Sequence, residues 1–107
     1  PEHDGEGVLQ DIHWAAGYVG FFPSYFMANV TAAQMAAVMS QEIGDLDQLM
    51  QQQSFDMINE WLTQNMYRYG AVYSGRELME HVCRGTFSST YYIDYLRNKF
   101  SEVYKLF

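Results

Sequence analysis

The amino-acid sequence predicts an all-α protein, and three observations point to this class. Apolar residues recur at helical spacing in successive segments, helix-capping residues stand before these segments, and glycines stand after several of them. No segment keeps the alternation of apolar and polar residues that is typical of a strand. At 107 residues the chain forms at most one domain, so we treat residues 1–107 as a single helical segment.

The first predicted helix is short and covers residues 9–14. Gly17 and Gly20 follow it and permit a turn with positive φ or a close backbone approach. Pro23 then fits the first turn of a long helix, which runs to about Ile43. That helix is apolar on nearly all sides, so we expect it to be buried on all sides. A chain of this size has difficulty wrapping such a helix alone, which indicates that part of the protein is missing.

Two short helices are predicted after Gly44, which should end the long helix as its C-cap. Asp45 and Gln48 make a capping box for a helix that reaches about residue 51. Ser54 caps the next helix, and Gly70 closes it. The predicted inward face of that helix consists of Phe55, Ile58, Trp61, Leu62 and Met66.

Two further helices complete the prediction. Ser74 and Glu77 form a second capping box, and Gly85 ends the helix that they open. Its inward residues are Leu78, Met79, Val82 and Cys83. Ser88 caps the last helix. The predicted buried stripe of that helix consists of Tyr92, Ile93, Leu96, Phe100, Val103, Tyr104 and Phe107.

The composition indicates a globular protein and argues against several classes of partner. Hydrophobic residues make up 49% of the chain and aromatic residues 17%, which a disordered chain does not show. A net charge of −7 argues against nucleic acid and anionic membrane surfaces. No Lys or Arg precedes Arg68, although nine acidic residues do. This acidic first part reflects either solubility and chance or a basic partner surface.

The sequence contains little evidence about cellular location. The single cysteine, Cys83, cannot form an internal disulfide, which suits a reducing compartment. No secretory signal pattern opens the sequence. The apolar run over residues 14–39 is interrupted by polar residues and glycines, which argues against a membrane span.

The candidate site lies just before and at the start of the long helix, where hydrogen-bonding side chains are concentrated. These side chains are Gln10, Asp11, His13 and Tyr25. Buried polar groups need partners, so the cluster is either a structural network or the lining of a pocket. A lone His beside a Trp is more often structural, and the density of polar groups here raises the weight of a functional role while leaving both alternatives open. We expect Trp14 to pack between the cluster and the long helix, so that Trp14→Ala costs roughly 3 kcal/mol or more.

Metal binding by this chain alone is not expected. On a helix, residues i and i+2 point about 200° apart, so Asp11 and His13 cannot chelate one ion from there. His3 and Asp4 could assist only if the first residues fold back. The sequence has no His-Glu-x-x-His motif, no paired cysteines and no Gly-rich phosphate loop. Since no serine stands on a strand-to-helix elbow either, we expect no complete active site.

The residues Gly7-x-x-Gln10-Asp11-x-His13-Trp14 match in full a signature of the M32 metallocarboxypeptidases, the thermostable carboxypeptidase family. The chain resembles this family over essentially its whole length. The further positions of resemblance are Gly17, Gly20, Phe22-Pro23-Ser24-Tyr25, Asn29, Ala32-Ala33-Gln34, Asp45-Leu46-Asp47, Trp61-Leu62, Tyr69-Gly70, Tyr73 and Tyr92-Ile93-x-Tyr95-Leu96. The chain departs from the family at Phe21, where a tyrosine is usual, and at Ala28, where a glycine is usual.

This resemblance implies an all-helical, zincin-type, cytoplasmic and homodimeric enzyme that removes C-terminal residues from peptides. Its zinc, or sometimes cobalt, is held by a His-Glu-x-x-His motif and a downstream Glu, all upstream of the region matched here. The chain therefore resembles the C-terminal portion of such an enzyme, joined to the remainder of the same polypeptide and inactive by itself. We expect neither nucleic acid nor membrane as a partner.

The resemblance also implies roles for individual residues. Gln10, Asp11 and His13 would close one end of the substrate groove, with Asp11 orienting His13 or an arginine from the rest of the enzyme. Tyr25 would reach toward the terminus of the bound peptide. The structural positions of the motif are Gly7, Trp14, Gly17, Gly20 and Pro23. Two alternatives remain open at this point, a non-enzymatic helical binding or regulatory module and a family member that keeps the fold without activity.

Overall fold

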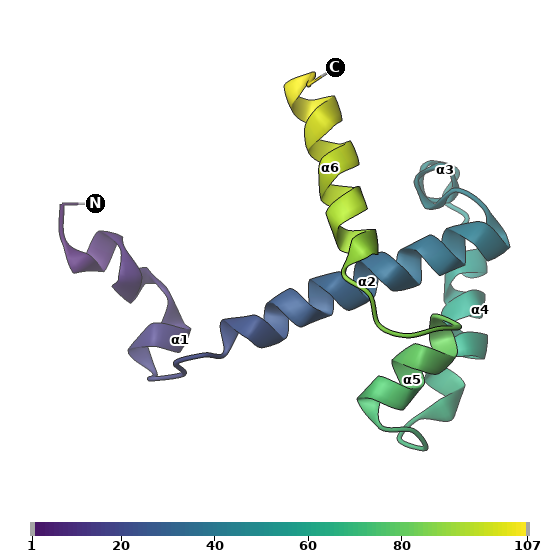
Figure 1. Ribbon diagram of the computed structural model, residues 1–107, viewed down its shortest axis with the longest axis horizontal. Coiled ribbons are helices and arrows are strands. Elements are labelled where there is room, and N and C mark those ends of the chain that lie inside the picture. The colour runs from purple at the N-terminus through teal and green to yellow at the C-terminus, as the bar shows by residue number, and fades with distance from the viewer. Residues whose placement is uncertain (1, 107) are drawn as a thin grey trace.

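The computed structural model describes residues 2–106, apart from the side chain of Val8, and within these residues it contains helices and no strand. The all-α prediction is therefore confirmed (Figure 1). The 3-10 helices are η1 (Asp4–Glu6), η2 (Val8–Gln10) and η3 (Tyr67–Tyr69). The α-helices are α1 (Ile12–Ala15), α2 (Phe22–Ile43), α3 (Leu46–Gln51), α4 (Phe55–Asn65), α5 (Gly75–Val82) and α6 (Thr90–Tyr104). Among the described residues, no helix is both long enough and apolar enough to cross a membrane.

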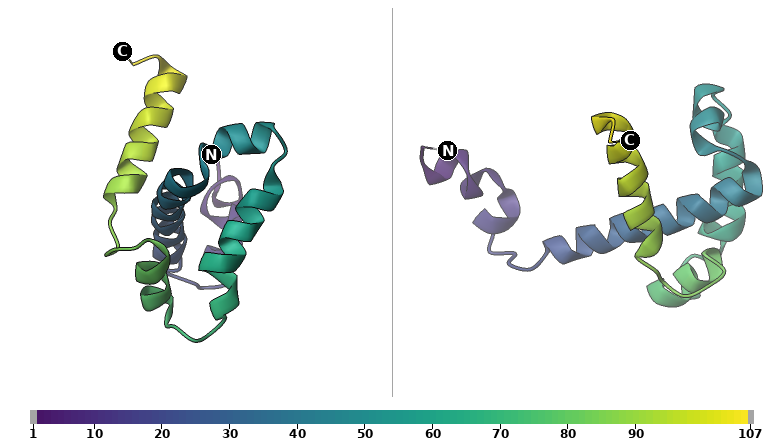
Figure 2. Two further views of the ribbon diagram at one scale, coloured as in Figure 1. Left: turned by 90° about the vertical axis from the view of Figure 1, so that its right-hand side faces the viewer. Right: turned by 45° about the horizontal axis from the view of Figure 1, so that its top comes forward.

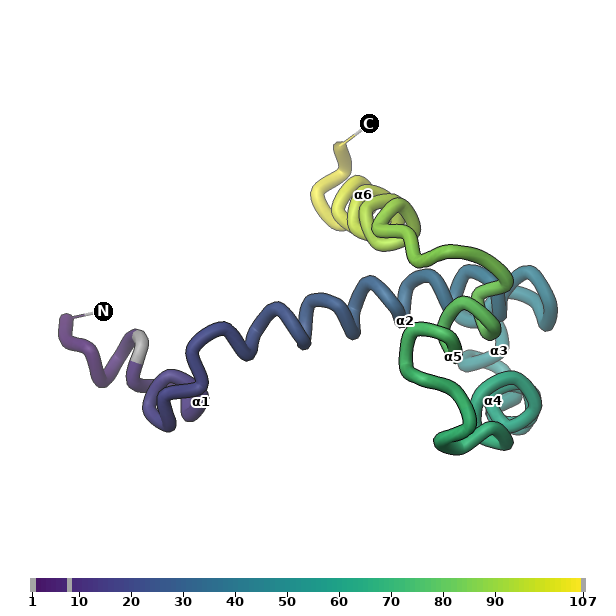
Figure 3. Tube along the Cα trace, turned by 60° about the horizontal axis from the view of Figure 1, so that its bottom comes forward, coloured from purple at the N-terminus to yellow at the C-terminus, as the bar shows by residue number. Residues whose placement is uncertain are grey.

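The long helix α2 organises the molecule, and the other helices are distributed along it (Figure 1). The helices α3, α4 and α5 gather around its C-terminal half, and we call this assembly the helical body. The short helix α1 lies beyond the opposite end of α2, while α6 leaves the middle of α2 and points away from it. Figures 2 and 3 show that α6 and α4 lie on opposite sides of α2. The radius of gyration is 17.6 Å, against about 13 Å for a compact domain of this length, so the arrangement is open.

A small hydrophobic core holds the helical body together. Its buried members are Val38, Met39, Trp61, Val82 and Cys83. Partly buried residues packed against them are Met35, Ile43, Leu46, Ile58, Leu62, Met66, Leu78 and Met79. The predicted inward faces of α4 and α5 are thereby confirmed, except for Phe55, which is the first residue of α4 and is exposed. Helical periodicity locates these faces because residues at helical spacing share one side of a helix, and that side packs against the core.

The expectation that the long helix is buried on all sides is wrong: its buried residues are Val30, Gln34, Val38 and Met39, which lie on one face, and its N-terminal half is the most exposed part. Tyr25, Phe26 and Met27 are exposed, and the first fully buried residue of α2 is Val30. The physical reason is that this half of α2 extends beyond the helical body (Figure 3), so no described helix covers it on all sides. An apolar helix indicates that cover is required, but it does not say which part of a protein supplies that cover.

The predicted buried stripe of the last helix is wrong for the same reason. The exposed members of that stripe are Ile93, Phe100, Val103 and Tyr104. Because α6 leaves α2 and points away from it, the described chain offers no partner for the later turns of α6 (Figures 1 and 2). Tyr92, near the start of α6, still packs its ring edge against Phe26 at 5.6 Å between centroids. Phe107, the last predicted member of the stripe, lies outside the described residues.

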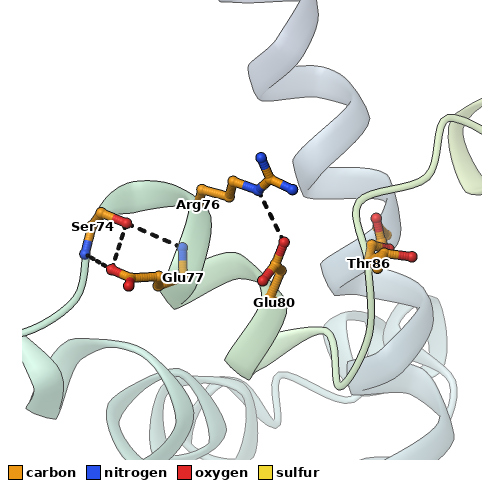
Figure 4. A network of polar contacts seen from close by, with 6 residues as sticks. Ser74, Arg76, Glu77, Glu80 and Thr86 are labelled. Carbon is orange, nitrogen blue, oxygen red and sulfur yellow. Dashed lines mark hydrogen bonds and ion pairs between the residues drawn. The ribbon is translucent and has the colours of Figure 1, made fainter.

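Helix ends follow the predicted capping chemistry where the partners are local. Figure 4 shows the capping box of α5, in which Ser74 Oγ accepts from the Glu77 N–H and Glu77 Oε2 accepts from the Ser74 N–H. Gly44 ends α2 with a φ of 100°, which glycine adopts readily. Asp45 Oδ1 accepts from the Gln48 N–H at 2.8 Å and caps α3. The described residues show no return bond from the Gln48 side chain, so only half of the predicted box is formed.

Other predicted helix boundaries need small corrections. Ser54 is the N-cap of α4, but its side chain makes no capping hydrogen bond. The N-cap of α6 is Ser89, while Ser88 Oγ accepts from the Thr90 N–H at 3.2 Å. The helix α4 ends at Asn65, so Gly70 does not close it as predicted and instead follows η3. Likewise α5 stops at Val82, so Gly85 lies in the loop beyond it.

A buried amide ties α2 to the loop that precedes α6. Gln34 is 3% exposed, and its Nε2 donates to the Thr86 carbonyl at 3.0 Å. Its Oε1 accepts from the Ser88 N–H at 2.9 Å. Both ends of the amide are therefore satisfied, as buried polar groups require. These two bonds fix the point at which α6 leaves α2.

The carboxylate of Glu42 joins α2 to two other parts of the helical body. Its Oε1 accepts from Arg84 Nε at 2.7 Å, and its Oε2 accepts from the Trp61 indole N–H at 2.7 Å. The hydrogen bond from Arg84, followed by that from Trp61, holds the pKa of Glu42 below its ordinary value. The hydrogen bond to Glu42 in turn raises the pKa of Arg84. This ion pair fixes the loop after α5 against the end of α2.

We expect Glu42→Gln to destabilise the fold at neutral pH and to lose this effect in acid. Since the folded-state pKa of Glu42 is depressed, its contribution is fully present above the unfolded pKa, near 4.5, and is lost as the pH falls through the folded pKa. Thermal unfolding of both proteins between about pH 7 and about pH 3 checks this sign. The two Tm values should converge in the acid range. A Tm difference that stays constant throughout would contradict the assignment.

Candidate functional site

The candidate site lies on the N-terminal arm, which we define as residues 2–25. Asp11 is the N-cap of α1, with an extended backbone at φ −95° and ψ 121°, and its Oδ1 accepts from the His13 N–H at 2.7 Å. The chain is therefore not one helix over residues 9–14, as predicted, but two short pieces that are divided at Asp11. Capping by aspartate explains this break, because an N-cap residue has non-helical φ and ψ.

A glycine turn brings the start of α2 back toward α1. Gly17 and Gly20 have φ values of 75° and 83°, as predicted for a turn that favours glycine. Pro23 stands in the first turn of α2, where its missing N–H leaves no bond unmade. The Tyr18 N–H also donates to the His13 carbonyl at 2.8 Å and fixes the turn to α1. Tyr25 is thereby placed beside His13 although twelve residues separate them.

Three of the four predicted site residues form one hydrogen-bonded row, which we call the relay. Asp11 Oδ1 lies 2.9 Å from His13 Nδ1, and His13 Nε2 lies 3.0 Å from the Tyr25 hydroxyl oxygen. The expectation that the Asp11 and His13 side chains point apart is wrong because Asp11 lies outside the helix. The relay thus joins a carboxylate, an imidazole and a phenol in that order.

The Asp11 carboxyl is held as a carboxylate. Partial burial raises its pKa, but hydrogen bonds from the His13 backbone and ring, the charge of His13 and a bond from the Trp14 backbone together outweigh burial and lower it. A carboxylate accepts hydrogen bonds and donates none. The proton between Asp11 and His13 therefore belongs to His13 Nδ1.

Aromatic rings surround the imidazole of His13. Phe21 stacks on it at 5.4 Å between centroids with an interplanar angle of 25°, and Phe22 lies 5.3 Å away. The ring of Tyr25 is nearly perpendicular to it, at 5.5 Å between centroids. The Asp11 side chain is 39% exposed, the His13 side chain 23% and Tyr25 48%, so His13 is the least exposed member of the relay and Tyr25 ends it with a phenol at the surface. We did not assign Phe21 and Phe22 to the site, although an aromatic run close to a lone His is the signal for such packing.

Gln10 and Trp14 do not join the relay. The Gln10 amide donates to the Gly5 carbonyl, and the backbone of Gln10 donates to the Gly7 carbonyl at 3.0 Å. Trp14 is 45% exposed, and its ring meets Phe22 at 5.8 Å between centroids. The expected burial of Trp14 is therefore wrong within this chain, because the exposed half of α2 does not close over it. The large stability loss expected of Trp14→Ala loses its basis with that burial.

The described side chains do not fit a metal site. Within residues 2–106, no three His, Cys, Asp or Glu side chains come together at a distance that suits one ion. Asp11 and His13 are bonded to each other, and His3 lies 3.5 Å from Glu6. A catalytic zinc needs three protein ligands and an open position.

A separate apolar cavity of about 550 Å³ lies between α2, α5 and the loop before α6. Its lining consists of Met27, Thr31, Gly75, Arg76, Met79, Thr86 and Phe87. Figure 4 shows the pair of Arg76 and Glu80, and it shows Thr86 on the neighbouring loop. The Arg76 Nε donates to Glu80 Oε1 at 3.0 Å, and both groups reach solvent. Arg76, the one cationic residue in the lining of this cavity, is already paired, and the rest of the lining is mostly apolar. The relay on the N-terminal arm therefore remains the candidate site.

Comparison with known proteins points to one family. The model of the family described as carboxypeptidase Taq (M32) metallopeptidase matches residues 1–100. The chain is 36% identical over 106 residues to Carboxypeptidase 1 of Bacillus subtilis (strain 168). It is 31% identical over 100 residues to Thermostable carboxypeptidase 1 of Pyrococcus furiosus and 31% identical over 104 residues to the protein of that name from Thermus thermophilus.

These matches cover nearly all of this chain and a small part of each relative. They include 99%, 94% and 97% of the chain but only 21%, 20% and 20% of the relatives, in the same order. The chain thus spans about a fifth of the length of the curated relatives that it matches. No solved structure matches the chain significantly.

Proposed function

This chain belongs to the carboxypeptidase Taq (M32) metallopeptidase family, and from this premise we propose that it is the C-terminal segment of a carboxypeptidase. The whole enzyme would remove residues from the C-termini of peptides. The names of the curated relatives support this activity, and the small share of each relative that is matched supports a segment of a longer chain. On this proposal the N-terminal arm forms one wall of the substrate groove.

The single observation that carries the proposed wall is the Tyr25 hydroxyl at the outer end of the relay. Tyr25 is half exposed, while its ring packs against Phe21 at 5.4 Å between centroids and its hydroxyl meets His13. A phenol suits such a place because it can donate to a carboxylate or a developing oxyanion without adding charge. Gln10 contributes to the wall through its position on η2, since its amide is engaged with the Gly5 carbonyl.

The remainder of the polypeptide is proposed to cover the apolar surfaces that the described chain leaves open. These surfaces are the N-terminal half of α2, which carries exposed Phe26 and Met27, and the outer turns of α6. Exposed apolar patches of this kind mark an interface. The preceding part of the same chain is the partner that the family match and the matched share of the relatives support.

The family match also supports proposals about the whole protein. We propose that it holds a divalent metal, zinc or cobalt, outside the segment described here, because the described side chains do not fit a metal site. When bound, that metal would supply Lewis-acid chemistry at the scissile carbonyl. We further propose a cytoplasmic homodimer. The free and buried Cys83 agrees with a reducing compartment.

We expect the isolated segment to bind zinc weakly and to cleave no blocked dipeptide, whereas the full-length protein cleaves it. The reason is the absence of three converging ligands among the described residues. Titration calorimetry with zinc and chromatography of the products measure the two properties. The segment that carries His13→Gln is the matched control and should titrate like the wild-type segment. A one-to-one zinc site of submicromolar affinity, or cleavage by the segment, would contradict the proposal.

A further inference from the structure

The direction of the two hydrogen bonds in the relay decides what Tyr25 can offer to a ligand. Asp11 fixes one proton on His13 Nδ1, since its carboxylate can only accept. In a neutral imidazole, Nε2 is then an acceptor, so the single proton of the Tyr25 hydroxyl points inward to Nε2. In this state the outer face of Tyr25 can accept a hydrogen bond but cannot donate one.

A second proton on His13 reverses the outer bond. Nε2–H then donates to the Tyr25 oxygen, and the hydroxyl proton is free to turn outward. Histidine is the side chain that ordinarily changes charge in the neutral pH range. A peptide carboxylate only accepts hydrogen bonds, so it can bind at Tyr25 without an unfavourable contact only when the relay holds this extra proton.

We propose that Asp11 and His13 are positioning residues for Tyr25, and that a peptide C-terminal carboxylate binds at Tyr25 together with one proton taken up by His13. This inference rests on the proposed function, because it takes the peptide terminus as the ligand of the wall. The proton comes from solvent and is held on Nε2. It returns to solvent when the peptide leaves.

The charges around His13 support this coupling. The groups that titrate or carry charge and face its ring are Asp11 on one side and Tyr25 and Tyr18 on the other. No Lys or Arg precedes Arg68, so His3 and His13 are the only side chains from which the N-terminal arm can draw a positive charge. His3 lies beside Glu6 instead.

The test is calorimetric titration of the full-length enzyme with a peptide analogue that has a reduced, non-cleavable bond and a free C-terminal carboxylate. Runs in two buffers of different ionisation enthalpy give the number of protons taken up on binding. We expect proton uptake on binding to rise from near zero in acid toward one proton as the pH is raised. Where the uptake is one proton, this coupling should weaken binding by about ten-fold for each further pH unit.

Three comparisons assign the proton to the relay. The C-terminal amide of the same analogue should bind with no such uptake. Tyr25→Phe should lose this uptake and roughly ten-fold in affinity, as removal of one hydrogen bond to a charged group does. His13→Gln should bind the carboxylate without uptake and with little pH dependence, because an amide N–H can donate to Tyr25 at any pH.

The outcomes that overturn the proposal are distinct from one another. If Tyr25→Phe weakens binding but leaves the proton count unchanged, Tyr25 contacts the peptide and the coupling to His13 is wrong. If wild type binds the carboxylate without proton uptake throughout the pH range, the coupling is also wrong. If Tyr25→Phe changes neither affinity nor proton count, the proposed groove wall fails together with the coupling.

Discussion

Replacing Trp61 with Ala is expected to destabilise the helical body by about 3–5 kcal/mol, as truncation of a large buried aromatic side chain does. Trp61 is 5% exposed and lies in the core with Met39 and Val82. Its indole N–H also donates to Glu42 at 2.7 Å. The truncation therefore leaves a cavity and removes one of the two side chains that donate a hydrogen bond to the Glu42 carboxylate.

The midpoint of urea unfolding measures this effect, and Trp61→Phe is the matched control. Phenylalanine refills most of the cavity but cannot donate to Glu42, so its cost should be near that of one hydrogen bond to a charged group, about 1.5–3 kcal/mol. Equal losses in the two variants would show that packing contributes little at this position. An unchanged midpoint in Trp61→Ala would contradict the core described here.

Local rules predicted the helices and most of their ends. The Ser74–Glu77 box and the Asp45 cap involve partners three residues apart, so short stretches of sequence contain all the groups concerned. The inward faces of α4 and α5 were predicted for a similar reason, because the period of a helix fixes which residues share a face. The extent of burial was not predictable in this way. The exposed turns of α2 and α6 depend on what covers them, and a helical pattern does not specify its partner.

The long-range hydrogen bonds that join α2 to the loops after α5 could not be predicted from the sequence, for a different reason. Glu42 and Arg84 are 42 residues apart, and Gln34 and Thr86 are 52 residues apart. No local spacing rule connects such positions. A polar residue inside an apolar run, such as Gln34, signals that a partner is needed but does not identify it.

Three of the four residues proposed for the candidate site lie together in the structure, and their geometry was not predicted. Asp11, His13 and Tyr25 were expected to act together, and the relay brings them together. Their arrangement follows from two features that no single local pattern contains. Asp11 caps α1 instead of joining it, and the turn through Gly17 and Gly20 returns the chain to His13. Gln10 was expected in the same cluster, but a carbonyl on its own side of the arm satisfies its amide.

The second large effect concerns catalysis by the full-length protein. We expect Tyr25→Phe to lower kcat/KM for a blocked dipeptide by about ten-fold to a thousand-fold, the usual result of losing one donor to a developing charge. The free energy of unfolding should change by only about 1 kcal/mol, because the variant loses a single hydrogen bond and little volume. Tyr18→Phe is the matched control, since it removes a hydroxyl from the same arm that bonds to none of the described residues.

Steady-state kinetics of these two variants test the central claim that the N-terminal arm is a wall of the substrate groove. The account predicts a large fall in kcat/KM for Tyr25→Phe and little change for Tyr18→Phe, with both proteins folded to the same extent. An unchanged kcat/KM for Tyr25→Phe, together with a loss of stability, would assign the Tyr25 hydroxyl to the scaffold and contradict the proposed wall.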